Sequence, residues 1–305
     1  MIECFFLLLE RISKMFESQF PLFGPGGNSE SFTLSGHKST IEAPAFVSGL
    51  GLTAYEYECG KGVRTSDAVL AAVGAEAKKY NISLSLHAPY FISLSGKEKE
   101  TRLKSLDYIE QSLRAADILG ADTIVVHSGS VGLGTREEAM LLSLDTLSKL
   151  LEHLGDRYAH ISIGIETMGR IGQLGTLDEV IRQCQLDPNR FVPVVDFGHL
   201  NARELGHYFP DADSYRAVFD RIAEKLGDRT AKYLHCHFSH IEYGKKGELK
   251  HLTFADTTYG PEFDSLAKAL KQENLCPRII CESAGTQAED AVTMMATYNA
   301  LHDIS

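Results

Sequence analysis

Short β-rich segments recur along the 305-residue chain, and a helix-forming stretch separates each from the next. Apolar residues in the intervening stretches fall three and four positions apart, which is the spacing of one helical face. Gly120 and Gly155 stand near the ends of two such stretches as helix stops. Eight strand-then-helix units in a chain of this length predict a closed (β/α)8 barrel, the TIM barrel. The expected strands are 20–24, 54–59, 83–87, 123–127, 162–167, 191–196, 233–238 and 278–282.

A doubly wound open sheet is the alternative α/β arrangement, but no GxGxxG motif follows the first strand. No linker rich in Pro, Gly or Ser divides the chain, so we expect one barrel domain over residues 16–305. Residues 1–15 read as an N-terminal extension or as the product of a mis-assigned start. Their apolar run is too short to span a bilayer and lacks a basic region before it, which predicts no membrane partner.

Charge and cysteine content limit the functional classes. The net charge of −11 gives no overall basic field of the kind that concentrates nucleic acid. The six cysteines contain no CxxC pair, and a chain of this size needs no disulfide staples. We therefore expect reduced thiols and a cytoplasmic protein, with no protein partner implied.

The ends of the expected strands carry an unusual run of metal-ligating residues. Active sites of TIM barrels gather at the C-terminal ends of the strands. The third to eighth strands end in His87, His127, Glu166, Asp196 with His199 three residues later, His237 and Glu282. Imidazoles with shared carboxylates suit zinc or manganese, and one carboxylate can bridge two ions. The sequence therefore predicts a metal centre at the mouth of the barrel.

Strand alternation supports this prediction, because only one face of each strand points into the barrel. In "SLSLH" the small Ser83 and Ser85 share a face with His87. In "HCH" both His235 and His237 face inward, and His237 lies about 6.6 Å nearer the open end. We expect His237 to be the ligand and His235 to be a deeper structural residue. The long stretch 239–259 after the seventh strand is expected to be an irregular loop on the active face.

Five motifs, taken in order, resemble the endonuclease IV family of metal-dependent apurinic/apyrimidinic endonucleases, which have a xylose isomerase-like TIM barrel. They are "HAPYFISL", "HSGS", "IETMGRIGQLGTLDEV", "VDFGH" and "CES". The resemblance implies two or three zinc ions and cleavage of DNA on the 5′ side of an abasic deoxyribose. It implies one ion on His87, His127 and Glu166, a second on Glu166, Asp196, His237 and Glu282, and a third on His199 and His251.

The chain departs from the family at two places. Leu249 stands where the third ion's aspartate is expected, and Glu248 would substitute for it after a shift of the loop. The segment after the second strand, "YECGKGVRTSD", lacks the family's DNA-gripping pattern. Tyr90 and Phe91 are candidate wedges into the duplex. Arg170, Lys245 and Lys246 are candidate phosphate contacts.

A second enzyme class fits part of the same set. Sugar isomerases and epimerases of this superfamily use a single divalent ion, which Glu166, Asp196, His237 and Glu282 would hold without the other histidines. Glu166 and Glu282 are the predicted catalytic residues, and in an isomerase they would exchange a proton beside a carbonyl. The extra histidines favour the hydrolase, while a metal-binding barrel without catalysis is a third interpretation. Glu58 is expected to be a surface carboxylate.

Overall fold

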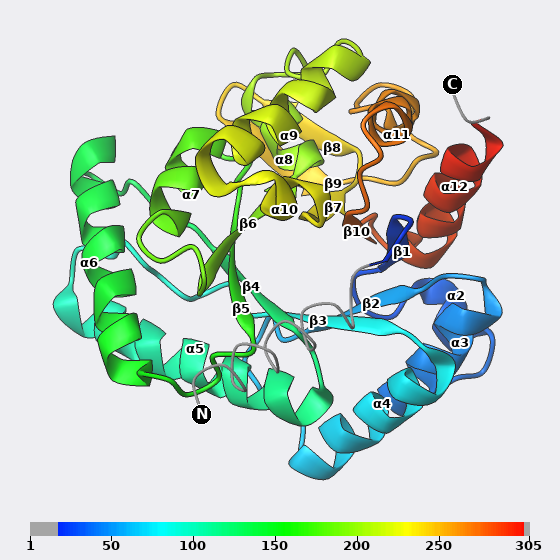
Figure 1. Cartoon of the computed structure of the whole chain (residues 1–305), viewed down its shortest axis with the longest axis horizontal. Coiled ribbons are helices and arrows are strands. Elements are labelled where there is room, and N and C mark those ends of the chain that lie inside the picture. The colour runs from blue at the N-terminus through cyan, green and yellow to red at the C-terminus, as the bar shows by residue number, and fades with distance from the viewer. Residues whose placement is uncertain (1–17, 302–305) are drawn as a thin grey trace.

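The computed structural model describes residues 18–301, in which eight parallel strands form one sheet surrounded by helices (Figure 1). The strand order is β1-β10-β7-β6-β5-β4-β3-β2. The strands are β1 (Leu22–Pro25), β2 (Ala54–Glu58), β3 (Ser83–His87), β4 (Thr123–His127), β5 (Ser162–Glu166), β6 (Phe191–Asp196), β7 (His235–Phe238) and β10 (Arg278–Cys281). This order is that of a TIM barrel and confirms the predicted fold.

The sheet closes on itself between β1 and β2. The Thr53 amide donates to the Phe23 carbonyl at 3.0 Å, and a parallel bridge joins Gly26 to Glu56. Gly24 makes this approach possible, because a Cβ atom at that position would lie 1.7 Å from the carbonyl oxygen of Ala54. The barrel is therefore continuous around its interior.

Helices cover the outside of the barrel on all sides in Figure 1. They are α2 (Glu30–Leu34), α3 (Ala43–Gly49), α4 (Asp67–Tyr80), α5 (Lys99–Leu119), α6 (Arg136–Leu154), α7 (Leu177–Cys184), α8 (Phe197–Arg203), α9 (Ala212–Leu226), α10 (Asp228–Lys232), α11 (Phe263–Gln272) and α12 (Gln287–Ala300), with a 3₁₀ turn at Thr40–Glu42. Thr135 and Thr176 begin α6 and α7 through capping boxes. Gly120 and Gly155 end α5 and α6 with positive φ, as predicted.

The two faces of the strands bury different chemistry. Outward-facing residues such as Leu84, Ile124 and Ile163 pack with the helices in one apolar core. Each such buried side chain contributes about 1.5–3 kcal/mol. The inward face instead carries Ser85 and most of the strand-end histidines and carboxylates, so the apolar layer that holds the barrel together lies outside it. The barrel interior is free to carry polar groups.

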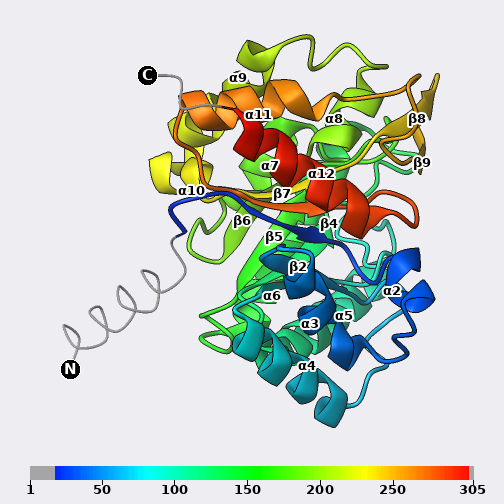
Figure 2. The same ribbon diagram turned by 90° about the vertical axis from the view of Figure 1, so that its right-hand side faces the viewer.

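Two differences from the predicted elements stand out. The segment expected to be an irregular loop contains a hairpin of β8 (Ile241–Gly244) and β9 (Gly247–His251). Figure 2 shows it at one end of the barrel beside α8. The prediction was wrong because charged residues conceal the strand alternation. The first strand also begins at Leu22, since pairing with β10 starts there and Phe20 is exposed.

The expected extension, residues 1–15, lies outside the described residues, and the single-domain boundary stays a prediction. Among residues 18–301, no helix combines the length and the apolar character that crossing a membrane requires. The five cysteines in this range are buried and free of disulfides.

Candidate metal centre

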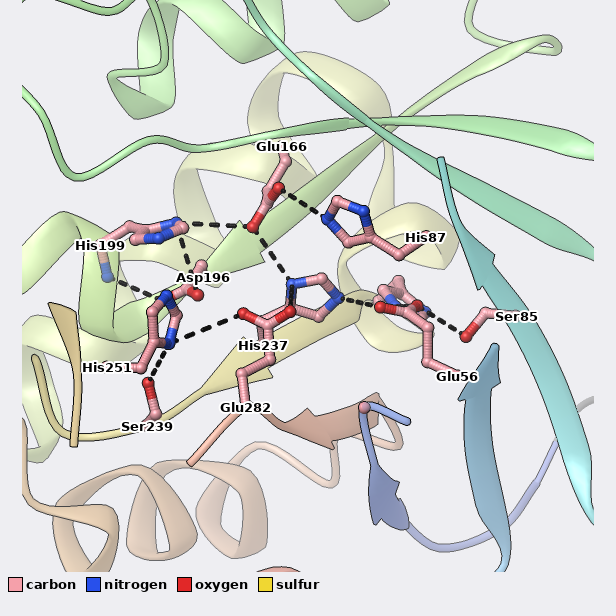
Figure 3. A network of polar contacts seen from close by, with 12 residues as sticks. Glu56, Ser85, His87, Glu166, Asp196, His199, His237, Ser239, His251 and Glu282 are labelled. Carbon is pink, nitrogen blue, oxygen red and sulfur yellow. Dashed lines mark hydrogen bonds and ion pairs between the residues drawn. The ribbon is translucent and has the colours of Figure 1, made fainter. Parts of the chain in front are cut away.

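The strand-end residues meet at one end of the barrel (Figure 3). Strand register brings neighbours together, because His127 pairs with Glu166 across β4 and β5, and Asp196 pairs with His237 across β6 and β7. Glu166, Asp196 and His237 are almost completely buried. Five groups among the described residues have ligand atoms within 4.8 Å of one another, and three of them contain the predicted strand-end residues: His87, His127 and Glu166; Glu166, Asp196, His237 and Glu282; and His199, Glu248 and His251.

Glu166 belongs to two of these groups, and its two oxygens face different partners. Oε2 lies 3.5 Å from Nε2 of both His87 and His127. Oε1 lies 3.1 Å from Nδ1 of His237 and 3.4 Å from Nδ1 of His199. A carboxylate in this position is arranged to bridge two cations, one on each side.

The first group is oriented by the backbone. Nδ1 of His87 lies 2.8 Å from the carbonyl oxygen of Ala88, and a carbonyl can only accept, so the ring donates from Nδ1. The lone pair of the neutral ring is then on Nε2, which faces Glu166. The His127 ring stands 5.3 Å from the His87 ring, centroid to centroid, and is the more exposed of the two.

The second group uses the start of α8 to orient Asp196. The Oδ1 atom of Asp196 accepts the backbone N–H of His199 at 2.7 Å, which caps the helix and leaves Oδ2 facing the site. Across the group, Glu282 follows the end of β10, and its Oε1 lies 3.4 Å from Nδ1 of His237. Four ligand atoms from four strands thus surround one point.

The third group contains a carboxylate from the hairpin. Nδ1 of His199 lies 2.9 Å from the carbonyl oxygen of Thr167, so in the neutral ring the lone pair is on Nε2, which lies 3.5 Å from Oε2 of Glu248. Gly169 allows this approach, because a Cβ atom there would lie 2.7 Å from that of Glu248. Glu248 therefore supplies the carboxylate beside His199 that Leu249 cannot supply, and the Leu249 side chain is exposed.

The carboxylates of this region hold His87, His199 and His237 in the charged form. Burial lowers the pKa of His87, but Glu166 and neighbouring carboxylates outweigh it and raise the value to about 10. Asp196 and Glu166 outweigh burial at His199, and Glu282, Glu56 and Glu166 outweigh it at His237, so the pKa values of both histidines are held well above normal. Burial raises the pKa of Glu166, yet its contacts with these histidines bring it well below the usual value. A divalent cation at this place would compete with protons.

Two groups at the rim show the opposite shifts. Burial lowers the pKa of His127 to about 4, despite the attraction of Glu166, so its imidazole is neutral at physiological pH. Burial, reinforced by Glu166 and Asp196, raises the pKa of Glu282 to about 8. His127 is therefore ready to donate a lone pair, and Glu282 is poised to carry a proton near neutrality.

Buried carboxylate oxygens without hydrogen-bond partners indicate that these residues suit a cation. Within the described part of the chain, Glu166 Oε2, Asp196 Oδ2 and Glu248 Oε2 are buried without a hydrogen-bond partner. Buried polar atoms are almost always satisfied, so three orphaned carboxylate oxygens at one end of a barrel call for a positive ligand. The donor set of imidazoles and carboxylates suits zinc or manganese.

Sequence reasoning missed Glu56. It is fully buried on the inward face of β2, where an oxygen lies 2.9 Å from Nε2 of His237. The signal was available, because Glu56 and Glu58 alternate with Tyr55 and Tyr57 in "AYEYE" and so share the inward face. Glu58 is exposed as expected, and a Glu58 oxygen lies within 4.8 Å of ligand atoms from Glu56 and Glu282.

The predicted substrate contacts lie on loops around this site. Tyr90 is 59% exposed and Phe91 is 43% exposed, directly after β3. Arg170 extends from the loop after β5, and its guanidinium lies 3.8 Å from Glu248. Lys245 and Lys246 form the exposed turn of the hairpin, which a backbone bridge between Arg170 and Gly247 joins to the β5 loop. All five are accessible to a ligand.

Comparison with known families and proteins gives a consistent set of relatives. The family model of the xylose isomerase-like TIM barrel matches residues 44–298. An uncharacterized protein of Methanocaldococcus jannaschii is 30% identical over 254 residues, which cover 83% of this chain and 89% of the relative. A probable endonuclease 4 of Shouchella clausii is 25% identical over 221 residues, which cover 69% of this chain and 73% of the relative.

Two solved structures with the same fold come from different enzyme classes. Endonuclease IV of Thermus thermophilus superposes with a TM-score of 0.64 at 18% identity, covering 92% of this chain and 98% of that one. The 3-keto-D-glucoside 4-epimerase of E. coli superposes with a TM-score of 0.65 at 17% identity, covering 92% and 100%. At these identities the superpositions establish a common fold and leave the chemistry to the site.

Proposed function

The chain belongs to the xylose isomerase-like TIM barrel family, and from this premise we propose that it is a metal-dependent phosphodiester hydrolase of the endonuclease IV type. Its substrate would be DNA with abasic sites, cleaved on the 5′ side of the lesion, as in DNA repair. The observation that carries the proposal is the position of Glu166 between two pairs of histidines, with distances of 3.1–3.5 Å to all four. A one-ion enzyme has no need of this arrangement.

The metal ligands follow from the three groups. We assign His87, His127 and Glu166 to one zinc, and Glu166, Asp196, His237 and Glu282 to a second. A third would be held by His199, His251 and Glu248. Bound divalent ions supply Lewis-acid activation of water and of a phosphoryl oxygen. Manganese is an alternative, because the same donor types bind it.

The protein groups have distinct roles in this proposal. The ionised carboxylate of Glu166 would be a ligand of both the first and the second ion and would hold the two sites together. Burial raises the pKa of Glu282 to about 8 in the metal-free site, so Glu282 would release a proton as it binds the second ion near neutral pH. Tyr90 and Phe91 would enter the DNA stack beside the abasic position. Arg170, Lys245 and Lys246 would contact phosphates, which offsets the unfavourable net charge of −11 locally.

A single-metal sugar epimerase or isomerase is the second candidate. Glu166, Asp196, His237 and Glu282 form a complete one-ion group by themselves. Two further observations favour a small substrate: the segment after β2 lacks a DNA-gripping pattern, and Glu58 adds an exposed carboxylate beside the site. The free cysteines fit a cytoplasmic protein with either activity.

A His127→Asn variant separates the two candidates, because His127 belongs only to the histidine pair that the one-ion enzyme does not use. The purified protein, supplied with zinc or manganese, is assayed on a duplex with one abasic-site analogue and on a panel of ketoses. The hydrolase proposal expects chelator-sensitive cleavage of the duplex that falls at least 100-fold in the variant. Ketose turnover that survives His127→Asn, with no cleavage of DNA, would support the epimerase. His153→Asn, at an exposed histidine on α6, is the matched control.

A further inference from the structure

A chain of buried polar residues crosses the barrel interior beneath the metal centre, and the proposed function makes no use of it. It runs from Arg278, at the start of β10, through His235, at the start of β7, to Glu56 in the middle of β2. The last contact reaches His237. All four residues point into the barrel, where an unneeded charge is costly. The donor and acceptor roles along this series of residues determine which ring nitrogen of each histidine carries the proton.

Arg278 determines the tautomer of His235. Its Nε donates to Nδ1 of His235 at 2.9 Å, and its other nitrogens donate to Asp122 Oδ1 at 2.6 Å and Ser83 Oγ at 2.8 Å. A guanidinium has donors and no acceptor. Nδ1 of His235 must therefore accept, and the ring proton lies on Nε2.

His235 in turn orients Glu56. Nε2 of His235 lies 3.0 Å from Oε2 of Glu56, and Ser85 Oγ donates to the same oxygen at 2.7 Å. One carboxylate oxygen is thus satisfied twice. The other, Oε1, lies 2.9 Å from Nε2 of His237. Within residues 18–301 both atoms are buried and neither has a hydrogen-bond partner, so the 2.9 Å contact between them is the interaction open to each.

The contact between Glu56 and Nε2 of His237 affects the other ring nitrogen, Nδ1. Nδ1 faces Oε1 of Glu166 at 3.1 Å and Oε1 of Glu282 at 3.4 Å, which is the interior of the four-residue group. A carboxylate that accepts a hydrogen bond from the N–H of one ring nitrogen leaves the lone pair on the other nitrogen and increases its basicity. We infer that Glu56 is a positioning residue that holds His237 with its proton on Nε2, so that Nδ1 is the metal-ligating atom. His235, Ser85 and Arg278 act through Glu56.

The geometry also argues against a rival interpretation. Ligand atoms of Glu56, His235 and His237 lie within 4.8 Å of one another and could be taken for a further metal site. With Nδ1 of His235 occupied by Arg278 and its proton on Nε2, this ring has no lone pair to offer. The inference rests on the proposed metal ligands and does not depend on which substrate the enzyme uses.

Two isosteric variants test the inference by metal binding. In Glu56→Gln the amide oxygen still accepts from His235 and Ser85, while its NH₂ group faces Nε2 of His237 and favours the wrong tautomer. Zinc affinity at the four-residue group should fall about 10–100-fold, and the ion on His87 and His127 should remain. In His235→Gln the amide accepts from Arg278 and donates to Glu56, so zinc count and affinity should match the parent protein. Glu179→Gln, a carboxylate paired with Arg136 among the outer helices, is the control.

Zinc is counted after gel filtration, and affinities are measured by competition with a chromophoric chelator. Unchanged affinity in Glu56→Gln overturns the inference, and loss of an ion in His235→Gln identifies His235 as a ligand and overturns it too. Long-range ¹H–¹⁵N spectra of the zinc-loaded parent protein read the tautomer without any variant. They should show His237 coordinated at Nδ1 and protonated at Nε2, and the reverse assignment contradicts the inference even if a variant fails to fold. Failure to cleave DNA would leave these outcomes unaffected.

Discussion

Replacing Glu166 with Gln should weaken two metal sites at once. The substitution preserves the volume of the side chain and removes one negative charge from a position that is 1% exposed. Each oxygen of Glu166 now lies within 3.5 Å of two histidine nitrogens. A neutral amide would present an oxygen to one pair and an NH₂ group to the other, so neither group keeps its full anionic ligand set.

The size of the effect follows from the place of the residue in both groups. Changing a residue that merely supports a ligand costs about 10–100-fold in metal affinity. Loss of a direct carboxylate ligand should cost at least about 100-fold at each site, or roughly 2.8 kcal/mol at about 1.4 kcal/mol per tenfold. The expected zinc content after gel filtration therefore falls by two ions relative to the parent protein.

The assay is a zinc titration against a chromophoric competitor, with a metal count on the same samples. Glu179→Gln provides the same chemical change at a carboxylate that accepts from Arg136 and belongs to none of the three metal groups, and it should bind zinc like the parent. Thermal unfolding of all three proteins guards against a folding defect. A Glu166→Gln protein that loses one ion and retains the other at full affinity would refute the bridging role.

Three further outcomes are expected. Glu248→Ala should remove one zinc ion, that of the third group, and leave the other two, which a metal count detects. Zinc affinity should rise between pH 6 and 8 by about tenfold per pH unit for each displaced proton. His87 (pKa about 10) and Glu282 (pKa about 8) hold protons in that range and must lose them to bind metal. A zinc affinity that does not change with pH would contradict these charge states. Gly24→Ala should destabilise the barrel by about 3 kcal/mol or more, because a Cβ atom there would overlap the Ala54 carbonyl, and a melting curve unchanged from the parent would contradict the closure described above.

The barrel and most of the candidate metal centre could be predicted from the sequence, for a physical reason. Parallel strands of a barrel end at the same face, so chemistry at six strand ends predicts one site without any knowledge of contacts. Strand alternation then separated His237 from Cys236, and the structure agrees, with His237 in the centre and Cys236 in the outer apolar core. Whether each of the converging residues binds an ion remains a prediction.

The hairpin and the position of Glu248 were not predicted, because they depend on tertiary contacts that the alternation of residues along a strand does not reveal. The hairpin was missed because its pairing is fixed by a tight turn and by the β5 loop, and its exposed strand is charged. Its formation brings Glu248 to His199, a distance that no sequence spacing gives. Glu56 was not predicted because it lies in the middle of β2, whereas the predicted ligands all lie at or after strand ends.

The bridging role of Glu166 is tested most directly by anomalous diffraction at the zinc edge from crystals of the zinc-loaded protein. A bridged centre should give two peaks flanking Glu166, about 3.5–4 Å apart, with a further peak between His199, Glu248 and His251. A single peak among Glu166, Asp196, His237 and Glu282, with none near His87 and His127, would contradict the bridged centre and with it the proposed hydrolase.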